Sequence, residues 1–231
     1  MARINKAAIT KLEIVQEATK QFLEKGFTAT TVSAISKALE MSPGNLTFHY
    51  PTKDHLLSEL VDMLCDFQWK LMEEEANDGI SSVMAICLEL ASMAGASEEE
   101  PVIKDFFISA YTSPMCLGII RRNDVERAKK VFGEYCKDWT HEQFAEAEIL
   151  CSGIEYATLM TTDDMISLET RISGAMDNIL RIFNVPMEVR KNKIQRVLAM
   201  DHRSLGKRAL REFREYVEQT NEEAFLNLLK R

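Results

Sequence analysis

The chain has 231 residues, of which 46% are apolar and 28% are charged, so it can bury the core of one or two compact domains. With 9 Gly and 5 Pro, its composition excludes a disordered, collagen-like or loop-dominated β protein. The formal net charge is −8, but residues 1–53 carry +3, residues 54–187 carry −15 and residues 188–231 carry +4. A basic N-terminal segment before an acidic body is typical of a protein whose N-terminus alone meets a polyanion.

Targeting segments, metal sites and cofactors find no support in the sequence. The N-terminus lacks the continuous apolar stretch of a secretory signal, and the longest apolar stretch, Ile80 to Ala96, contains Glu89 and is too short for a membrane span. The five cysteines are scattered without a C-x-x-C pair, which is typical of free thiols packed in a core. We therefore expect a soluble, cytoplasmic protein with no metal, no cofactor and no membrane contact.

The apolar periodicity is helical from the first element onward. Residues 8–25 carry one apolar stripe, which predicts a first helix that ends at Gly26. A short second helix follows, with Thr30 or Thr31 as its N-cap and its last apolar position at Leu39.

Two further helix starts are marked by their capping residues. Ser42 and Pro43 are typical of an N-cap and a first-turn proline, and they predict a third short helix through about His49. Thr52 can cap a long fourth helix that runs to about Ala76. Seven more helices are predicted over residues 80–94, 101–112, 115–138, 141–162, 166–184, 187–201 and 204–229. No segment alternates as a strand does, so the predicted fold class is all-α.

The second and third helices have the plan of a helix-turn-helix, in which the later helix enters the DNA major groove. Their inner face consists of Val32, Ile35, Leu39, Leu46 and Tyr50. The residues left facing outward on the third helix are Pro43, Gly44, Asn45, Thr47, Phe48 and His49. From periodicity alone, these short helices could equally form the corner of a generic helical bundle.

The identities of the residues in this segment, beyond their periodicity, favour DNA binding. They are Phe22, Gly26, Phe27, Thr30, Thr31, Val32 and Ile35, followed by Ser42, Pro43, Gly44, Asn45, Leu46, His49, Tyr50, Lys53, Leu56 and Leu57. With their spacing, residues 8–60 resemble the N-terminal domain of the tetracycline-repressor (TetR) family of transcriptional regulators. The resemblance implies a DNA-binding domain over residues 1–53 and an effector-binding and dimerisation domain over residues 54–231.

The same resemblance implies contacts with the phosphate backbone. Thr30 or Thr31, at the start of the second helix, matches the family's phosphate contact, and an N-cap hydroxyl with free amides suits an anion. Lys53 matches the basic residue that also grips the backbone. His49 matches a residue that reaches phosphate in the family, although it could equally be a half-buried polar helix end.

The third helix then matches the family's recognition helix. Gly44 corresponds to the small residue that lets this helix sit close to the groove, and Asn45, Thr47 and Phe48 hold positions that meet base edges or flanking phosphates. Asparagine can pair with adenine, while the threonine methyl and the phenylalanine edge can contact the methyl group of thymine.

Three departures from the family pattern bear on affinity and specificity. Thr47 stands where an aromatic ring is usual, and Glu40 stands at a turn position commonly held by glycine. If Glu40 is left-handed, its side chain costs about 1 kcal/mol. Residues 43–52 contain no Lys or Arg, so the usual arginine–guanine contact cannot come from this helix. We therefore expect a modest-affinity binder that prefers A·T-containing half-sites.

Residues 54–200 are rich in Met, Cys and aromatic residues, which at helical spacing form a core or line an apolar pocket. Glu89 stands out because its helix is apolar nearly all round. A buried carboxylate needs a partner, which a cationic ligand could provide, unless Glu89 faces solvent through a narrow slot. The candidate effector-binding residues are Phe67, Met84, Cys87, Glu89, Phe107, Tyr111, Met115 and Tyr156.

These features predict a ligand-responsive transcriptional regulator rather than an enzyme, since no catalytic motif is present and the four histidines are dispersed. By the resemblance, we expect a repressor that binds a palindromic operator on double-stranded DNA as a homodimer and is released by a small apolar or aromatic effector. The dimer interface is expected on residues 144–160 and 166–183. The alternative is a helical scaffold or protein-interaction module that no longer binds DNA.

Overall fold

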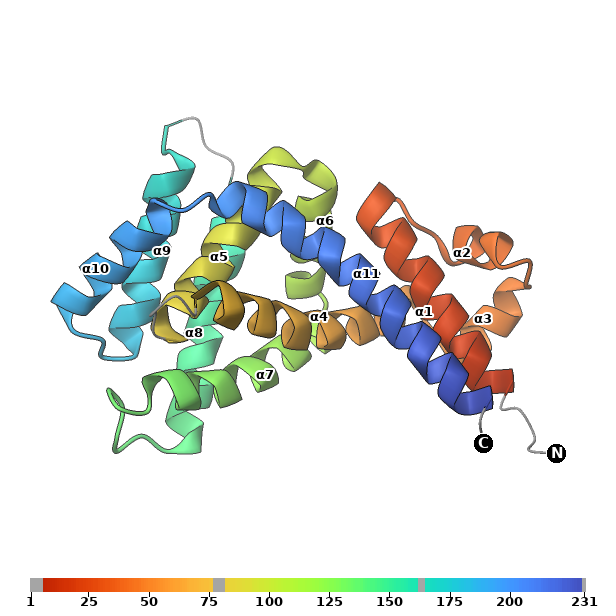
Figure 1. The fold of residues 1–231 in the computed structure, drawn as a ribbon, viewed down its shortest axis with the longest axis horizontal. Coiled ribbons are helices and arrows are strands. Elements are labelled where there is room, and N and C mark those ends of the chain that lie inside the picture. Colours follow the sequence, from red (N-terminus) through yellow and green to blue (C-terminus); the bar gives the residue numbers. More distant parts are fainter. Residues whose placement is uncertain (1–5, 77–81, 162–164, 230–231) are drawn as a thin grey trace.

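The computed structural model describes residues 6–76, 82–161 and 165–229, which form eleven α-helices and no β-strand (Figure 1). The prediction of an all-α fold is confirmed, and every predicted helix has a counterpart. The helices are α1 (Lys6–Lys25), α2 (Val32–Ala38), α3 (Pro43–His49), α4 (Lys53–Ala76), α5 (Ser82–Glu99), α6 (Pro101–Thr112), α7 (Pro114–Phe132), α8 (His141–Met160), α9 (Leu168–Ile182), α10 (Met187–Leu198) and α11 (His202–Leu229).

Helices α1 to α3 form a small head at one end of the molecule (Figure 1). Phe22 of α1, Ile35 of α2 and Leu46 of α3 are fully buried and hold the three helices together. Gly26 has φ +94°, a value that favours glycine, and it turns the chain sharply after α1. The ring of Phe27 then packs edge-on against Phe22, with 5.1 Å between the ring centroids.

The predicted capping residues set the starts of the two short helices. The Thr31 hydroxyl accepts a hydrogen bond from the amide of Ala34 at 3.0 Å, and the Ser42 hydroxyl accepts one from the amide of Asn45 at 3.2 Å. Pro43 occupies the first turn of α3, where no helical donor is needed. Of the two candidate caps for α2, the structure selects Thr31.

The body is built around α5, which packs against α4, α6, α9, α10 and α11. The last of these, α11, runs from the body back along α1 (Figure 1). The Asn221 side-chain amide donates to the carbonyl oxygen of Leu12 at 3.1 Å, and Arg214 forms a 2.7 Å ion pair with Glu24. The head is therefore attached to the body both by α4 and by α11.

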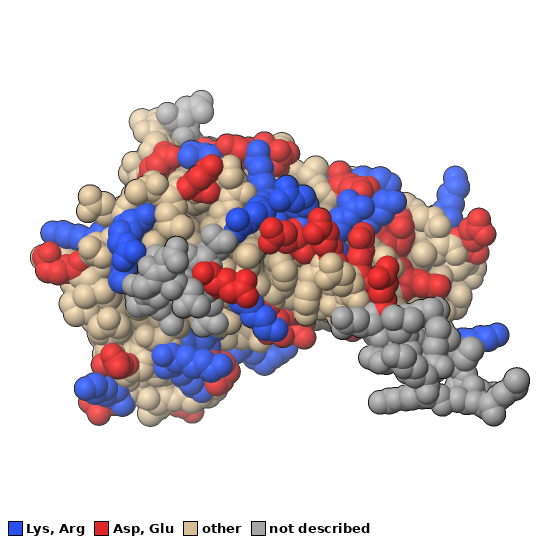
Figure 2. Space-filling model, viewed as in Figure 1, with Lys and Arg blue, Asp and Glu red and all other residues tan. Residues whose placement is uncertain are grey.

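Part of the positive charge of the C-terminal segment is paired with the acidic body. Lys207 forms a 2.5 Å ion pair with Glu99, and Arg203 forms one of 2.7 Å with Glu169. On the face shown in Figure 2, basic and acidic side chains are interleaved along the path of α11. This face therefore lacks the one-sided basic charge of a DNA-binding surface.

Two helix ends differ most from the prediction, and the predicted helix limits at residues 80 and 162 lie outside the described residues. Helix α5 continues through Gly95 to Glu99, because Gly95 marks a close helix approach rather than a helix stop: a Cβ there would lie 3.0 Å from Cδ2 of His202. Helix α7 ends at Phe132 rather than near residue 138, and a turn follows it. No helix in the described ranges is long and apolar enough to cross a membrane.

Candidate DNA-binding and effector sites

Helix α3 presents one face to the core and the other to solvent. Leu46 is fully buried, and Tyr50 behind it is also buried. Asn45 and Thr47 are exposed, and Phe48 is 81% exposed, with its ring edge-on to His49 at a centroid distance of 5.3 Å. An unsupported phenylalanine ring on a short solvent-facing helix is available for contact with a partner.

The remaining predicted positions on α3 fit the same geometry. Pro43 and Gly44 are exposed at the N-terminal end of the helix, and the nearest atom to a Cβ built on Gly44 would be 4.0 Å away. His49 is half-buried at the C-terminal end, as both readings of this residue allow. The start of α3 can therefore approach a flat surface closely.

The two threonines before α2 have different environments. Thr30 is 1% exposed, and its hydroxyl donates to the carbonyl oxygen of Gly26 at 2.7 Å. Thr31 is exposed and caps the helix. Only Thr31 therefore has a hydroxyl that faces solvent, together with the free amides of the first turn of α2.

Lys53 is tied to the turn between α1 and α2. Its ammonium donates to the carbonyl oxygens of Phe27 at 2.6 Å and Thr30 at 2.8 Å, and it lies 4.0 Å from the centroid of the Phe27 ring. Burial lowers the pKa of Lys53, while the carboxylates of Asp105 and Asp54 oppose that shift. With two of its three protons committed, Lys53 has one left for a phosphate.

The same turn is held from the body by Asp105 of α6. One carboxylate oxygen of Asp105 accepts a hydrogen bond from the amide of Thr28 at 2.8 Å, and the other accepts one from the Thr28 hydroxyl. A Cβ on Gly26 would lie only 2.8 Å from this carboxylate. No pattern in the sequence singled out Asp105, because a contact across 77 positions leaves no local signal.

Glu40, in the turn between α2 and α3, has φ +53°. This is the left-handed conformation, so the expected strain of about 1 kcal/mol for a side chain other than glycine applies. Its exposed carboxylate also adds negative charge beside α3.

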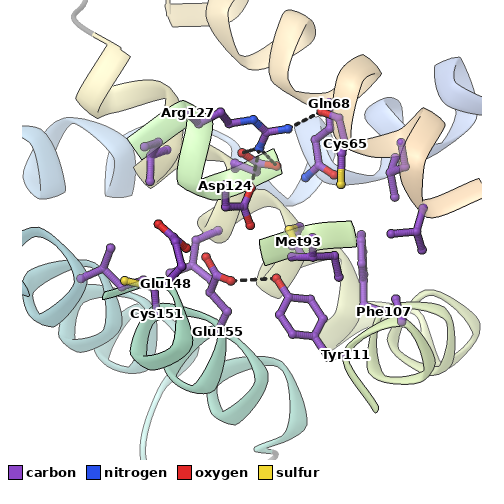
Figure 3. A pocket seen from close by; sticks show the side chains of 18 of the residues that line it. Cys65, Gln68, Met93, Phe107, Tyr111, Asp124, Arg127, Glu148, Cys151 and Glu155 are labelled. Atoms are coloured by element: carbon purple, nitrogen blue, oxygen red, sulfur yellow. Dashed lines mark hydrogen bonds and ion pairs between the residues drawn. The ribbon is translucent and has the colours of Figure 1, made fainter. Parts of the chain in front are cut away.

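A cavity in the body is bounded by side chains from α4, α5, α6, α7, α8 and α9 (Figure 3). The space between its walls is about 780 Å³, a value that includes the solvent at its open mouth. Much of its wall is apolar, including Leu90, Met93 and Phe107. Its ionisable lining includes Glu89, Tyr111, Asp124, Arg127, Glu148 and Glu155.

Three of the predicted effector residues line this cavity: Glu89, Phe107 and Tyr111. Five do not: Phe67, Met84, Cys87, Met115 and Tyr156. Phe67 points to α11 instead, with its ring centroid 5.7 Å from that of Phe213. Met84 and Cys87 are buried core residues, Met115 is exposed and Tyr156 is half-buried. All eight predicted residues lie on helices that line the cavity, but five of them are on a part of the helix that does not face it.

Glu89 has a cationic partner within the chain. Arg127 of α7 lies 3.1 Å from its carboxylate, contacts Asp124 at 3.3 Å and also donates to the carbonyl oxygen of Cys65. The guanidinium lies over the ring of Trp69, 4.9 Å from its centroid. The hypothesis that Glu89 needs a cationic ligand is therefore corrected: a salt bridge satisfies this carboxylate.

Other carboxyl groups of the cavity have strongly shifted pKa values. Burial raises the pKa of Asp124 to about 7, against the opposing effect of Arg127. Burial, reinforced by the charge of Asp124, raises the pKa of Glu148 to about 8. Tyr111 donates a hydrogen bond to Glu155 at 2.9 Å, and burial raises the pKa of both groups well above their usual values.

Glu148 and Glu155 were not among the predicted effector-binding residues. They are seven positions apart on α8, with Cys151 between them, so a helical projection places all three on one face. That spacing was the available signal. Among the described residues, no cluster of three or more potential ligands could hold a metal ion.

Residues 14–60 match the family described as "Bacterial regulatory proteins, tetR family". The structure is similar to that of RolR in complex with resorcinol, with 16% identity, coverage of 84% of this chain and 97% of that chain, and a TM-score of 0.67. It is also similar to Thermus thermophilus FadR, described as a TetR family transcriptional repressor in complex with lauroyl-CoA. For that pair the identity is 16%, the coverage 74% and 91%, and the TM-score 0.55. None of the curated proteins compared with the sequence matches it.

Proposed function

Because residues 14–60 match the family described as "Bacterial regulatory proteins, tetR family", we propose that the chain is a repressor that binds a palindromic operator and leaves it when a small molecule fills the cavity. The observation that carries this proposal is the solvent-facing side of α3, where Asn45, Thr47 and Phe48 are exposed on a helix held from behind by Leu46. A helix presented in this way fits the major groove.

The contacts proposed for DNA follow from the exposed groups. The Thr31 hydroxyl and the first amides of α2 suit a phosphate, with a single remaining Lys53 proton beside them. Asn45 is placed for a base edge, with Thr47 and Phe48 for thymine methyl groups. Because residues 43–52 contain no Lys or Arg, A·T-containing half-sites are the expected targets.

The proposed functional unit is a homodimer, because one head reads too few base pairs for specificity. Its interface is proposed on α8 and α9, where Ile149 and Leu150 are 53% and 56% exposed and Met160 is also exposed. Gly153 on the same helix has open space around it. Ser152, which we expected in this interface, faces inward and accepts a hydrogen bond from Arg121 at 2.9 Å.

The proposed signal passes from the cavity to the head through α4 and α6, which both line it. Lys53 at the start of α4 and Asp105 on α6 both hold the turn between α1 and α2. A ligand that binds one arrangement of these helices better than another shifts the heads by that difference in affinity, typically about 1–3 kcal/mol.

The test is fluorescence anisotropy with DNA from upstream of the protein's own gene, at several salt concentrations. A specific binder retains its complex over competitor DNA and shows a negative salt slope. Asn45→Ala should weaken binding by about 1–3 kcal/mol at one base position, while Glu188→Gln at an exposed position of α10 should not. Equal affinity for operator and competitor DNA would support the scaffold alternative instead.

A further inference from the structure

The cavity contains more carboxyl groups than cations. Glu89, Asp124, Glu148 and Glu155 line it, and Arg127 is the one arginine among the lining residues (Figure 3). Burying several carboxylates in a largely apolar wall is costly unless each has a counter-charge or keeps its proton. The distribution of partners among these groups therefore indicates what the cavity can bind.

Arg127 is already engaged. Its guanidinium pairs with Glu89 and Asp124 at 3.1 and 3.3 Å and donates to the carbonyl oxygen of Cys65. These contacts come from α4, α5 and α7, so they bind three walls of the cavity to one another. Arg127 is thus a structural cation, and the carboxyls of α8 are left without it.

Among the described residues, Glu148 is the cavity carboxyl without a hydrogen-bond or ion-pair partner. It is 5% exposed and lines the cavity, yet within the described part of the chain it forms neither a hydrogen bond nor an ion pair. The nearby Arg121 directs its Nε to the hydroxyl of Ser152. Glu148 therefore has a buried carboxyl that faces an open space rather than a partner.

Glu155 lies about two turns further along α8 and faces the same space (Figure 3). Its hydrogen-bond partner is neutral: the Tyr111 hydroxyl, which donates to it at 2.9 Å. A hydroxyl donor fixes the position of this carboxyl without neutralising a charge. Glu148 and Glu155 thus offer two neighbouring carboxyl groups to one ligand group, and that of Glu155 is held in place by Tyr111.

We propose that the effector is a cationic amphiphile, an ammonium or amidinium group on an apolar body, and that Glu148 and Glu155 hold its cation. This inference rests on the proposed function and specifies the ligand of its cavity. Leu90, Met93 and Phe107 form an apolar wall for the body of the ligand. Charge-assisted hydrogen bonds to the two carboxylates supply the specificity.

The proposed binding mode also predicts that protons are released when the cation binds. Burial raises the pKa of Glu148 to about 8 and that of Asp124 to about 7, so the empty cavity retains protons near neutral pH. A bound cation favours the ionised carboxylates and expels those protons. The charged and titratable groups that act on Glu148 and Glu155 are Glu89, Tyr111, Arg121, Asp124, Arg127 and Cys151.

The experiment is isothermal titration calorimetry of the full chain, without DNA, with three probes that share one body: 4-phenylbutylammonium, 4-phenylbutanol and 4-phenylbutyrate. We expect the ammonium to bind at least about tenfold more tightly than the alcohol, and the carboxylate more weakly than either. Between pH 6 and 8 the affinity for the ammonium should rise, and buffers of different ionisation enthalpy should reveal proton release.

The matched variants are Glu148→Gln with Glu155→Gln, and Glu188→Gln as the control, at an exposed carboxylate of α10. The double variant should lose the preference for the ammonium and its pH dependence, while the control retains both; thermal melts check that each variant is folded. The inference is overturned if alcohol and ammonium bind equally, if the butyrate binds best, if millimolar ammonium does not bind, or if the double variant keeps the preference. Because no DNA is present, none of these results decides whether the protein binds an operator, which the anisotropy assay decides separately.

Discussion

Replacing Asp105 with alanine should loosen the head from the helix that lines the cavity. The substitution removes two hydrogen bonds to Thr28, one from its amide at 2.8 Å and one from its hydroxyl. A hydrogen bond to a charged group contributes about 1.5–3 kcal/mol when buried, and less where solvent screens it. These bonds are exposed, so together we expect them to stabilise the contact by about 1–2 kcal/mol.

The assay is native-state hydrogen exchange of a peptide spanning residues 26–38, which contains the turn and α2. A loss of about 1–2 kcal/mol should accelerate its exchange by a factor of about 5–30. Asp105→Asn retains one acceptor and should lie between alanine and the wild type. Asp66→Ala, which removes an exposed carboxylate from α4, is the matched control and should leave the exchange of this peptide unchanged.

An unchanged exchange rate in Asp105→Ala would refute the reasoning, because the contact would then contribute nothing to the order of the turn. Equal acceleration across all eleven helices would refute it too, since that pattern indicates global rather than local destabilisation. The predicted pattern is acceleration confined to the head.

Three further substitutions and one pH dependence follow from the structure. Glu40→Gly relieves a left-handed backbone at φ +53° and should raise the free energy of unfolding by about 1 kcal/mol in urea titrations. Phe48→Ala removes a ring that is 81% exposed, so stability should change by less than about 0.5 kcal/mol while operator affinity falls. Arg127→Met leaves the Glu89 carboxylate unpaired and should lower the free energy of unfolding by about 3–5 kcal/mol. The folded-state pKa of Glu148 is raised from 4.5 to about 8, so the protonated group stabilises the fold fully below about pH 4.5. This contribution is lost progressively as the pH rises from there through about 8, and thermal melts should show that Glu148→Gln flattens the decline.

For each of these four predictions, one result would contradict the reasoning. A less stable Glu40→Gly variant would mean that the carboxylate makes a contact worth more than the strain. Loss of stability in Phe48→Ala would assign that ring to the core, and an unaffected Arg127→Met variant would show that the salt bridge contributes little. A Glu148→Gln melt that parallels the wild type at every pH would contradict the raised pKa.

The periodicity and capping residues predicted the helices well, because those signals are local. Ser42, Pro43 and Thr31 mark the starts of short helices through bonds that span only three positions. The buried residues Ile35 and Leu46 repeat at spacings that a single helix face dictates, so the outward side of α3 followed from the sequence.

The cavity was predicted less well, because it depends on how each helix is rotated against its neighbours. Phe67 and Cys87 lie on helices that line the cavity but face away from it. The partner of Glu89 is 38 positions away, and the contact of Asp105 with the head spans 77. Long-range pairs of this kind leave no mark in local patterning, although the seven-residue spacing of Glu148 and Glu155 could have been read as one shared face.

The return of α11 along α1 limits how the head can move. A head mounted only on α4 could swivel in any direction, but Asn221 and Arg214 fix a second point on α1. Asp105 of α6 holds a third point, at the turn that follows α1. With three helices of the body attached to it, the head has no free swivel, so a displacement produced in the body reaches the head only when α4, α6 or α11 itself shifts.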